Sequence, residues 1–194
     1  MSRFVLQVPT EGKLPPARSA HGAAVYDGKL WVFGGFDGHS RLNDMWCIDL
    51  CGSGPLHKWQ WQEVTQTADC PPPCCNFALA QHKDYMFLFS GQSGAKSTDS
   101  LFQFHFPSRT WSKISTEHIL RASSPPPSRR YGHTMVAYNN ALYVFGGAAE
   151  SIHPHDLHCY DLDTQEWYLV APCQNSQCPH GRLFHSAVVL GDSM

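Results

Sequence analysis

Apolar runs that stop at a pair of glycines recur along this chain at a fixed spacing. Residues 29–35 read Lys-Leu-Trp-Val-Phe-Gly-Gly, and residues 141–147 read Ala-Leu-Tyr-Val-Phe-Gly-Gly. Residues 85–91, Tyr-Met-Phe-Leu-Phe-Ser-Gly, repeat the pattern with a serine in place of the first glycine. The final glycines stand at positions 35, 91 and 147, which are 56 residues apart. A sequence with such a period is an array of like structural units.

Each unit is predicted to contain four antiparallel strands. In the first unit the strand-like segments fall at 22–26, 29–35, 42–49 and 59–64, and Asp27-Gly28 is a hairpin signal between the first two. The second segment is continuously apolar, as expected for a strand that is covered on both faces. The first segment has small residues that suit a crowded axis, and the fourth carries a large aromatic residue. These features predict an all-β fold, a partial β-propeller with about three complete four-stranded blades.

The period also predicts the boundaries of the units. Complete blades are expected at 14–64, at 65–114, which is divergent, and at 115–170. Residues 1–13 would be the outer strand of a preceding blade, and residues 171–194 a connecting loop and the first strand of a truncated blade. Three blades and two incomplete ones cannot close a ring, and bare edges favour aggregation. We therefore expect a truncated product or fragment that folds poorly alone, an expectation that reversible melting of a monomer would contradict.

An Arg-x-x-His motif recurs at the same place in the units. It comprises Arg18 with His21, Arg130 with His133, and Arg182 with His185, whereas the middle unit has Cys74 and Phe77 at these positions. A catalytic pair normally occurs once in a domain, so the recurrence favours a structural role, with the guanidinium donating to backbone carbonyls between blades. The residues predicted to mark the repeat are Arg18, His21, Gly34, Gly35, Trp61, Gly91, Trp111, Arg130, His133, Gly146, Gly147, Trp167, Arg182 and His185.

Strand direction predicts where a binding surface lies. The loops after the diglycines and the long loops after each fourth strand emerge on one face, and they differ between units while the strands do not. Variable loops on a rigid scaffold commonly carry binding function. The loops are 36–41, 92–99 and 148–155, joined by 65–74 and 115–129. The residues predicted to contact a protein partner are Asp37, His39, Arg41, Gln92, Ser93, Lys96, Glu150, His153 and His155.

Composition narrows the classes of function. The 194 residues are 42% hydrophobic and have 14 Lys+Arg against 16 Asp+Glu, so a packed core is expected and a nucleic-acid partner is not. No run approaches the roughly 20 apolar residues of a membrane-spanning helix. The apolar stretch near the start is too short for a signal peptide, so the eight cysteines are expected to be reduced thiols.

The sequence predicts neither a metal site nor a catalytic motif. Cys70, Cys74 and Cys75 flank three prolines, and Cys173 lies near Cys178, but these spacings are not those of usual zinc sites. His153, His155 and His158 lie close in sequence, yet His158 occupies the position of Trp46 and Phe102 in the other units, which favours a packed core residue. No nucleophile elbow or phosphate-binding loop is present, so neither an enzyme nor a cofactor is predicted. A metal-dependent propeller oxidase remains the alternative from another class.

The period, the four strands and the diglycine resemble the blades of kelch propellers. Several stretches are also similar to the kelch region of the leucine-zipper-like transcriptional regulator family. They include Cys74, Phe77 and Ser90, at which the middle unit departs from the repeat. These stretches are 18–22, 41–46, 74–77, 89–96, 116–121, 129–137 and 157–161. The resemblance implies the client-recognition part of a cullin-RING ubiquitin ligase adaptor that acts on Ras-family small GTPases. It also implies that contact with the cullin is made only through BTB and BACK modules, which these residues do not include. The implied location is cytoplasmic, at the cytosolic face of the Golgi or other endomembranes.

Overall fold

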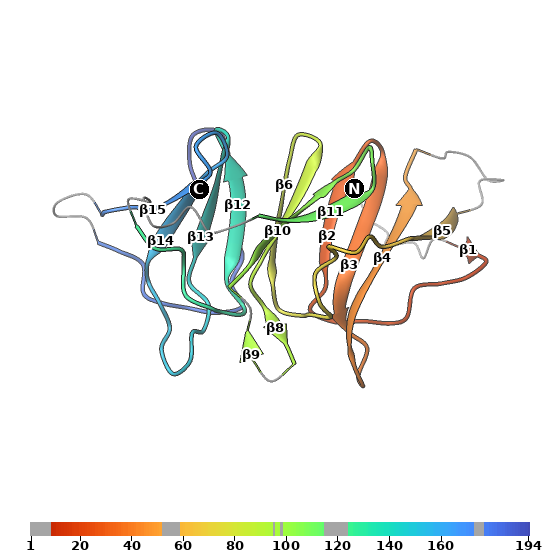
Figure 1. Ribbon diagram of the computed structural model, residues 1–194, viewed down its shortest axis with the longest axis horizontal. Helices are drawn as coiled ribbons and strands as arrows, with labels where there is room; N and C mark the ends of the chain where they lie inside the picture. Colours follow the sequence, from red (N-terminus) through yellow and green to blue (C-terminus); the bar gives the residue numbers. More distant parts are fainter. Residues whose placement is uncertain (1–8, 52–58, 95, 98, 115–123, 173–176) are drawn as a thin grey trace, which may run out of the picture.

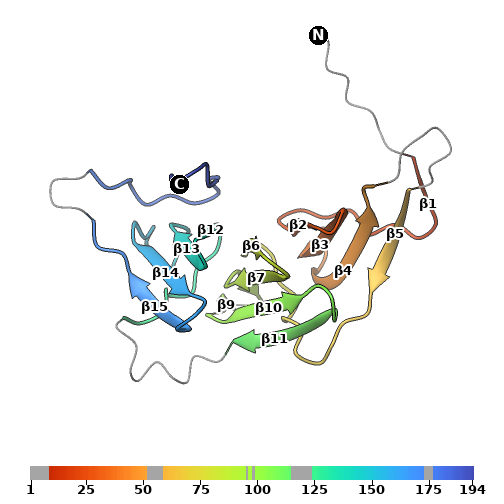
Figure 2. The ribbon, with the colours of Figure 1, turned by 90° about the horizontal axis from the view of Figure 1, so that it is seen from above.

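In the described part of the chain, three sheets each contain four antiparallel strands, and the first sheet has a fifth, parallel strand at its edge. The computed structural model describes residues 9–51, 59–94, 96–97, 99–114, 124–172 and 177–194. The sheets stand side by side in Figure 1, and Figure 2 shows them splayed from a common centre, with β2, β6 and β12 innermost and β5, β11 and β15 outermost. This arrangement confirms the predicted partial propeller, and we name the sheets blades 1, 2 and 3 in chain order. No helix long and apolar enough to cross a bilayer occurs in the described part of the chain.

The strands follow the predicted order within each blade. Blade 1 consists of β2 (Gly22–Tyr26), β3 (Lys29–Phe36), β4 (Arg41–Asp49) and β5 (Trp59–Val64), with β1 (Thr10–Glu11) parallel to β5. Blade 2 consists of β6 (Ala78–His82), β7 (Tyr85–Phe89), β10 (Leu101–His105) and β11 (Thr110–Ile114). A separate hairpin, β8 (Gln92–Ser93) with β9 (Lys96–Ser97), extends from blade 2. Blade 3 consists of β12 (Thr134–Tyr138), β13 (Ala141–Phe145), β14 (Leu157–Asp161) and β15 (Glu166–Leu169).

The incomplete blades that the sequence predicts at the two ends of the chain stay predictions. Residues 1–8 lie outside the described part, so the assignment of 1–13 to a preceding blade stays a prediction. At the other end, residues 182–189 form no ladder, although a first strand was predicted there. In the three described blades each innermost strand pairs with the second strand of its own blade, as β2 does with β3.

The core lies between blades and not within a single sheet. One apolar cluster includes Trp31 and Phe33 of blade 1 and Phe104 and Trp111 of blade 2. The other includes Phe89 of blade 2 together with Leu142, Val144 and Trp167 of blade 3. The second strands of blades 1 and 2 are buried on both faces as predicted, whereas β13 alternates between buried and half-buried positions. The outer aromatics differ in depth, because Trp111 and Trp167 are buried and Trp61 is only half-buried.

The diglycine allows close packing of each blade on its own first segment. Gly35, Gly91 and Gly147 have positive φ, and an added Cβ would lie within 2.6–2.8 Å of the Cβ atoms of His21, Phe77 and His133, respectively. No real Cβ makes such a contact, so only glycine fits this second position. At the first position Gly34, Ser90 and Gly146 share a left-handed backbone, with φ of 59°, 58° and 68°. Serine can therefore adopt the backbone of this position, as Ser90 does, but an added Cβ would lie 3.0 Å from the Cys74 carbonyl oxygen at Gly34 and 2.6 Å from the Arg182 carbonyl oxygen at Gly146.

Hydrogen bonds at equivalent positions join blade 1 to blade 2, blade 2 to blade 3, and blade 3 to the C-terminal segment. The amides of Gly35, Gly91 and Gly147 donate to the carbonyls of Cys74, Arg130 and Arg182 at 2.9, 2.9 and 2.7 Å. A second series joins the left-handed residues Ala20, Asn76, Gly132 and Phe184, the amide of each donating to the carbonyl of the one before it. At the opposite edge of the blades, side-chain hydrogen bonds of 2.8–2.9 Å join Tyr26 to Asp84, His82 to Asn140, and Tyr138 to Asp192. These bonds position the loops that the blades carry.

Candidate protein-interaction face

The recurring arginines fix the base of the candidate face. Arg130 is fully buried, and its guanidinium donates to both carboxylate oxygens of Asp156 at 2.8 and 3.1 Å and to the Gly146 carbonyl at 3.1 Å. Arg18 makes the equivalent bonds to Asp44 and to the Gly34 carbonyl. Each guanidinium contacts the carbonyl of a glycine in the blade that follows it in sequence, Gly34 for Arg18 and Gly146 for Arg130. The prediction that the guanidinium groups bond to carbonyls between blades is therefore wrong. The bond between blades is instead made by the backbone carbonyl of Arg130, which accepts a hydrogen bond from the amide of Gly91 in the preceding blade.

The carboxylates of this network were not identified from the sequence. Asp44 and Asp156 each follow the second glycine by the same interval, at 44 after 35 and 156 after 147, so a search for acidic residues in the repeat could have found them. Burial opposes ionisation of Asp156, but hydrogen bonds from His158 and Arg130 hold the pKa of its carboxyl well below its usual range. A bidentate arginine–carboxylate pair gives a well-defined geometry as well as energy.

The three histidines of the motif differ in their surroundings: His133 packs in the seam between blades 2 and 3, His185 packs on blade 3, and His21 is exposed. His133 is buried and meets the ring of Phe89 edge-on at 5.6 Å, and His185 meets Phe145 in the same way at 5.6 Å. Burial, aided by the charge of Arg130, lowers the pKa of His133 to about 3. His21 is exposed, and burial of part of the ring lowers its pKa less far. Arg182 is exposed and donates to the carbonyl of His180.

The loops predicted to bind a partner gather at one edge of the blades, the lower edge in Figure 1. We name this edge the loop face; it contains the β3–β4 connection, the β8–β9 hairpin and the β13–β14 connection. Asp37 accepts hydrogen bonds from the amides of Ser40 and His39 at 2.7 and 2.8 Å, which lower the pKa of its carboxyl. His39 is thereby held exposed at the tip of the turn, and Arg41 is half-buried where β4 begins.

The remaining predicted contact residues fall on the other two loops. The Gln92 side chain accepts a hydrogen bond from Asn76 at 2.8 Å, and Ser93 is half-buried beside it in β8. Lys96 begins β9, and its side chain lies outside the described part. Glu150, His153 and His155 are exposed in the β13–β14 connection. Their role in binding stays a prediction.

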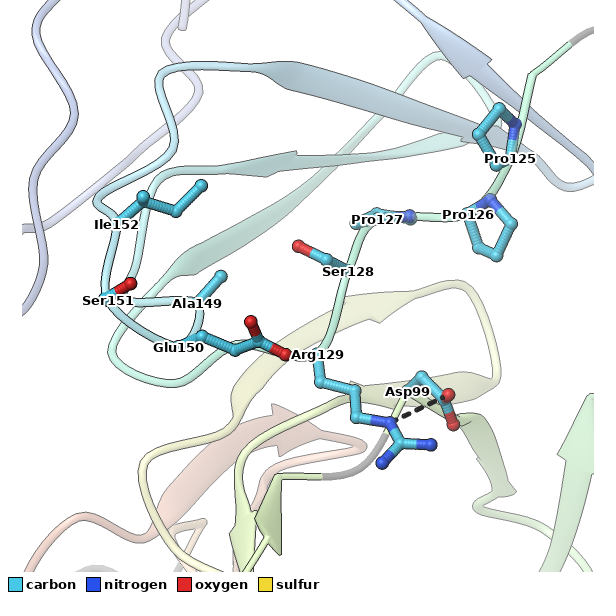
Figure 3. Close-up of a pocket in the computed structure, with 10 residues that line it drawn as sticks. All are labelled: Asp99, Pro125, Pro126, Pro127, Ser128, Arg129, Ala149, Glu150, Ser151 and Ile152. Carbon is cyan, nitrogen blue, oxygen red and sulfur yellow. Dashed lines mark hydrogen bonds and ion pairs between the residues drawn. The ribbon is translucent and has the colours of Figure 1, made fainter.

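A pocket of about 540 Å³ opens on the loop face between blades 2 and 3. One wall is the proline-rich segment 125–129, the other is the turn 149–152, and Asp99 lies at the margin (Figure 3). Arg129 reaches across the seam to Asp99, with its Nε 3.1 Å from the carboxylate. Of the predicted contact residues, this pocket includes Glu150. Sequence reasoning identified both segments as loops but did not bring them together.

The histidine and cysteine groups considered as metal sites are dispersed. His158 is buried, and its Nε2 donates to Asp156 at 2.8 Å, as Trp46 does to Asp44 in blade 1. His153 and His155 are exposed on the loop. Burial raises the pKa of the Cys70 and Cys74 thiols to about 12. In the described ranges no three His, Cys, Asp or Glu side chains group as a metal site would require, and Cys173 lies outside those ranges.

The blades, the diglycines and the repeated seam contacts define a kelch propeller segment. The family model of the KLHDC2/KLHL20/DRC7 kelch-repeats domain matches residues 2–194, and the chain belongs to the kelch-repeat family. The chain is 57% identical over 184 residues to the leucine-zipper-like transcriptional regulator 1 homolog of Drosophila melanogaster, and 58% identical over 167 residues to leucine-zipper-like transcriptional regulator 1 of Homo sapiens. These matches cover 94% and 86% of the chain but only 18% and 20% of the relatives. Kelch domain-containing protein 2 of Bos taurus is 27% identical over 201 residues, covering 93% of the chain and 48% of that protein.

Proposed function

We propose that this chain is the client-recognition part of a cullin-RING ubiquitin ligase adaptor and that its clients are Ras-family small GTPases. The kelch fold and the similarity to leucine-zipper-like transcriptional regulator 1 support a protein-interaction module. The ligase and GTPase parts of the proposal rest on the family resemblance of the sequence, as does a place of action at the cytosolic face of endomembranes.

The observation that carries the interaction role is the contrast between the loop face and the seams. Seam contacts recur at equivalent positions from blade to blade, which holds the scaffold in one geometry. The three loops on the face differ in sequence and in structure, with an Asp37 turn, a β8–β9 hairpin and a β13–β14 connection. Rigid support with variable loops is the arrangement used for recognition of protein surfaces.

The test measures binding of purified Ras-family GTPases, in their GDP and GTP-analogue forms, to the immobilised chain. We expect at least one GTPase to bind and the triple variant His39→Ala/Ser93→Ala/His153→Ala to weaken that binding. The matched control is Asp163→Ala, an exposed residue in the turn between β14 and β15. If no member of the panel binds, the client assignment fails. Binding that the triple variant leaves unchanged would remove the loop face from the proposal.

A further inference from the structure

The pocket between blades 2 and 3 has a pre-organised proline wall. Three consecutive prolines, Pro125 to Pro127, restrict the backbone and offer no amide donors. The segment is anchored at both ends, because the Ser124 hydroxyl donates to the Trp167 carbonyl at 3.0 Å and the buried Arg130 donates to the Ser128 carbonyl and hydroxyl at 3.0 and 3.2 Å. A partner meeting this wall would lose little free energy to ordering it.

The opposite wall is a turn held in an unusual conformation. Ala149 and Ile152 exchange two backbone hydrogen bonds of 3.0 Å, and between them Glu150 has a φ of +52°. Such a backbone is uncommon for a residue other than glycine, asparagine or aspartate. Gly181 lies close to the backbone that follows the turn, because a Cβ added there would lie 1.9 Å from the His153 carbonyl oxygen. The strained turn therefore presents the Glu150 and Ile152 side chains at a defined place.

The charges around the pocket do not cancel. Arg129 is paired with Asp99, and the described residues offer no hydrogen-bond or ion-pair partner to the Glu150 carboxylate. Ile152, two residues further on, is 63% exposed despite its large apolar side chain. Figure 3 shows both on the same turn, with the Glu150 side chain directed toward Arg129 and the Ile152 side chain directed toward the side of the pocket where the prolines lie. The surface thus presents one unpaired negative charge beside uncovered apolar area.

We infer that this pocket receives a client segment in which a lysine or arginine lies next to a large apolar side chain. The basic group pairs with Glu150, and the apolar group packs on Ile152 and the prolines. The inference deepens the proposed function, since it gives the chemistry by which the loop face would select a protein client. Complementary charge would contribute mainly specificity and association rate, and apolar burial would contribute affinity.

The test titrates the isotope-labelled chain with three capped peptides that differ only at the central dipeptide: Lys-Leu, Glu-Leu and Lys-Ser. We expect the Lys-Leu peptide to shift amide signals of residues 128–129 and 149–152 and to bind most tightly. An exposed ion pair is worth up to about 1 kcal/mol, so Glu150→Gln should weaken the Lys-Leu peptide by about threefold to fivefold. Ile152→Ala should weaken it to a similar extent, whereas the control Asp163→Asn should leave it unchanged.

A second variant separates charge from backbone strain. Glu150→Gly keeps the left-handed turn and removes the carboxylate, so it should behave like Glu150→Gln. Equal shifts with the Lys-Leu and Glu-Leu peptides, or no shifts at 149–152, would overturn the inference. If a GTPase binds and Glu150→Lys leaves its affinity unchanged, the inference fails while the proposed function stands. If the Lys-Leu peptide binds the pocket but no GTPase binds, the GTPase assignment fails and the pocket remains.

Discussion

Blade 2 achieves the same backbone geometry as blades 1 and 3 with different side chains. Where blades 1 and 3 have an Arg–Asp pair with a buried guanidinium and a partly exposed carboxylate, blade 2 has the buried Cys74 at the arginine position and Ser100 at the aspartate position. Phe77 replaces the motif histidine and meets Phe33 at 5.9 Å, compared with 5.6 Å between Phe89 and His133. The backbone bond from the second glycine to the next blade is unchanged in length, 2.9 Å at both Gly35 and Gly91.

The comparison separates what the repeat requires from what it tolerates. The left-handed backbone at the first glycine position and the missing side chain at the second are retained in all three blades. The arginine, the aspartate and the histidine are replaceable, because apolar packing can fill their space without a charge that needs a partner. Ser90 adds compensation of its own, since its hydroxyl exchanges hydrogen bonds with the backbone of Arg130 at 2.8 and 2.9 Å.

Replacing residues of the blade 3 Arg–Asp pair by their blade 2 equivalents should lower the free energy of unfolding most when only one member of the pair is replaced. Asp156→Ser leaves the fully buried Arg130 without its carboxylate, and an unpaired buried charge of this kind destabilises by about 3 kcal/mol. Arg130→Cys/Asp156→Ser removes both charges, so the two changes should be non-additive, with the double variant no less stable than Asp156→Ser alone. Urea unfolding followed by tryptophan fluorescence measures three variants: Asp156→Ser, Arg130→Cys and the double variant.

The exposed Asp163→Ser serves as the control for this cycle, and a surface substitution of this kind should change the free energy of unfolding by less than about 0.5 kcal/mol. Strictly additive effects of the two blade 3 substitutions would show that the pair is not a unit. The difference between blades would then need another explanation.

The two glycines of blade 1 should respond differently to serine. At Gly34 the backbone is that of Ser90, and the nearest atom to an added Cβ is the Cys74 carbonyl oxygen at 3.0 Å, so we expect a cost of about 1 kcal/mol. At Gly35 the Cβ would meet the Ser19 carbonyl oxygen at 2.7 Å and the His21 Cβ at 2.8 Å, with a cost of about 2 to 3 kcal/mol. Unfolding midpoints of Gly34→Ser and Gly35→Ser compare them directly. Equal losses would contradict the assignment of the steric limit to the second glycine.

Much of this architecture could be predicted from the period alone. The spacing of glycines 35, 91 and 147 located the blades, and the strand order followed from alternation of apolar runs and turns. The Arg–Asp pairs were missed because their members stand 26 positions apart, at 18 and 44 and at 130 and 156, and only the closed β-ladder brings them into contact. The pocket was missed for a similar reason: residues 125–129 and 149–152 belong to different loops, and their approach depends on the seam geometry.

Acidification should lower the free energy of unfolding through His133 in blade 3. Blade 2 has Phe77 at the equivalent position, and this residue does not titrate. Burial lowers the pKa of His133 from 6.5 to about 3, so the folded state favours the neutral ring. A lowered pKa on a base means that its full stabilising contribution is present above pH 6.5 and is lost as the pH falls toward about 3. Linkage then predicts a loss of about 2 kcal/mol between pH 7 and pH 5. His133→Phe, which copies Phe77, should remove this part of the pH dependence and leave the smaller contributions of His21 and His185, whose pKa values burial also lowers. Urea unfolding of the parent chain and of His133→Phe at pH 7 and pH 5 measures the difference. Equal losses of unfolding free energy in the two proteins would mean that His133 is protonated in the folded protein, and that its burial is not what distinguishes the two seams.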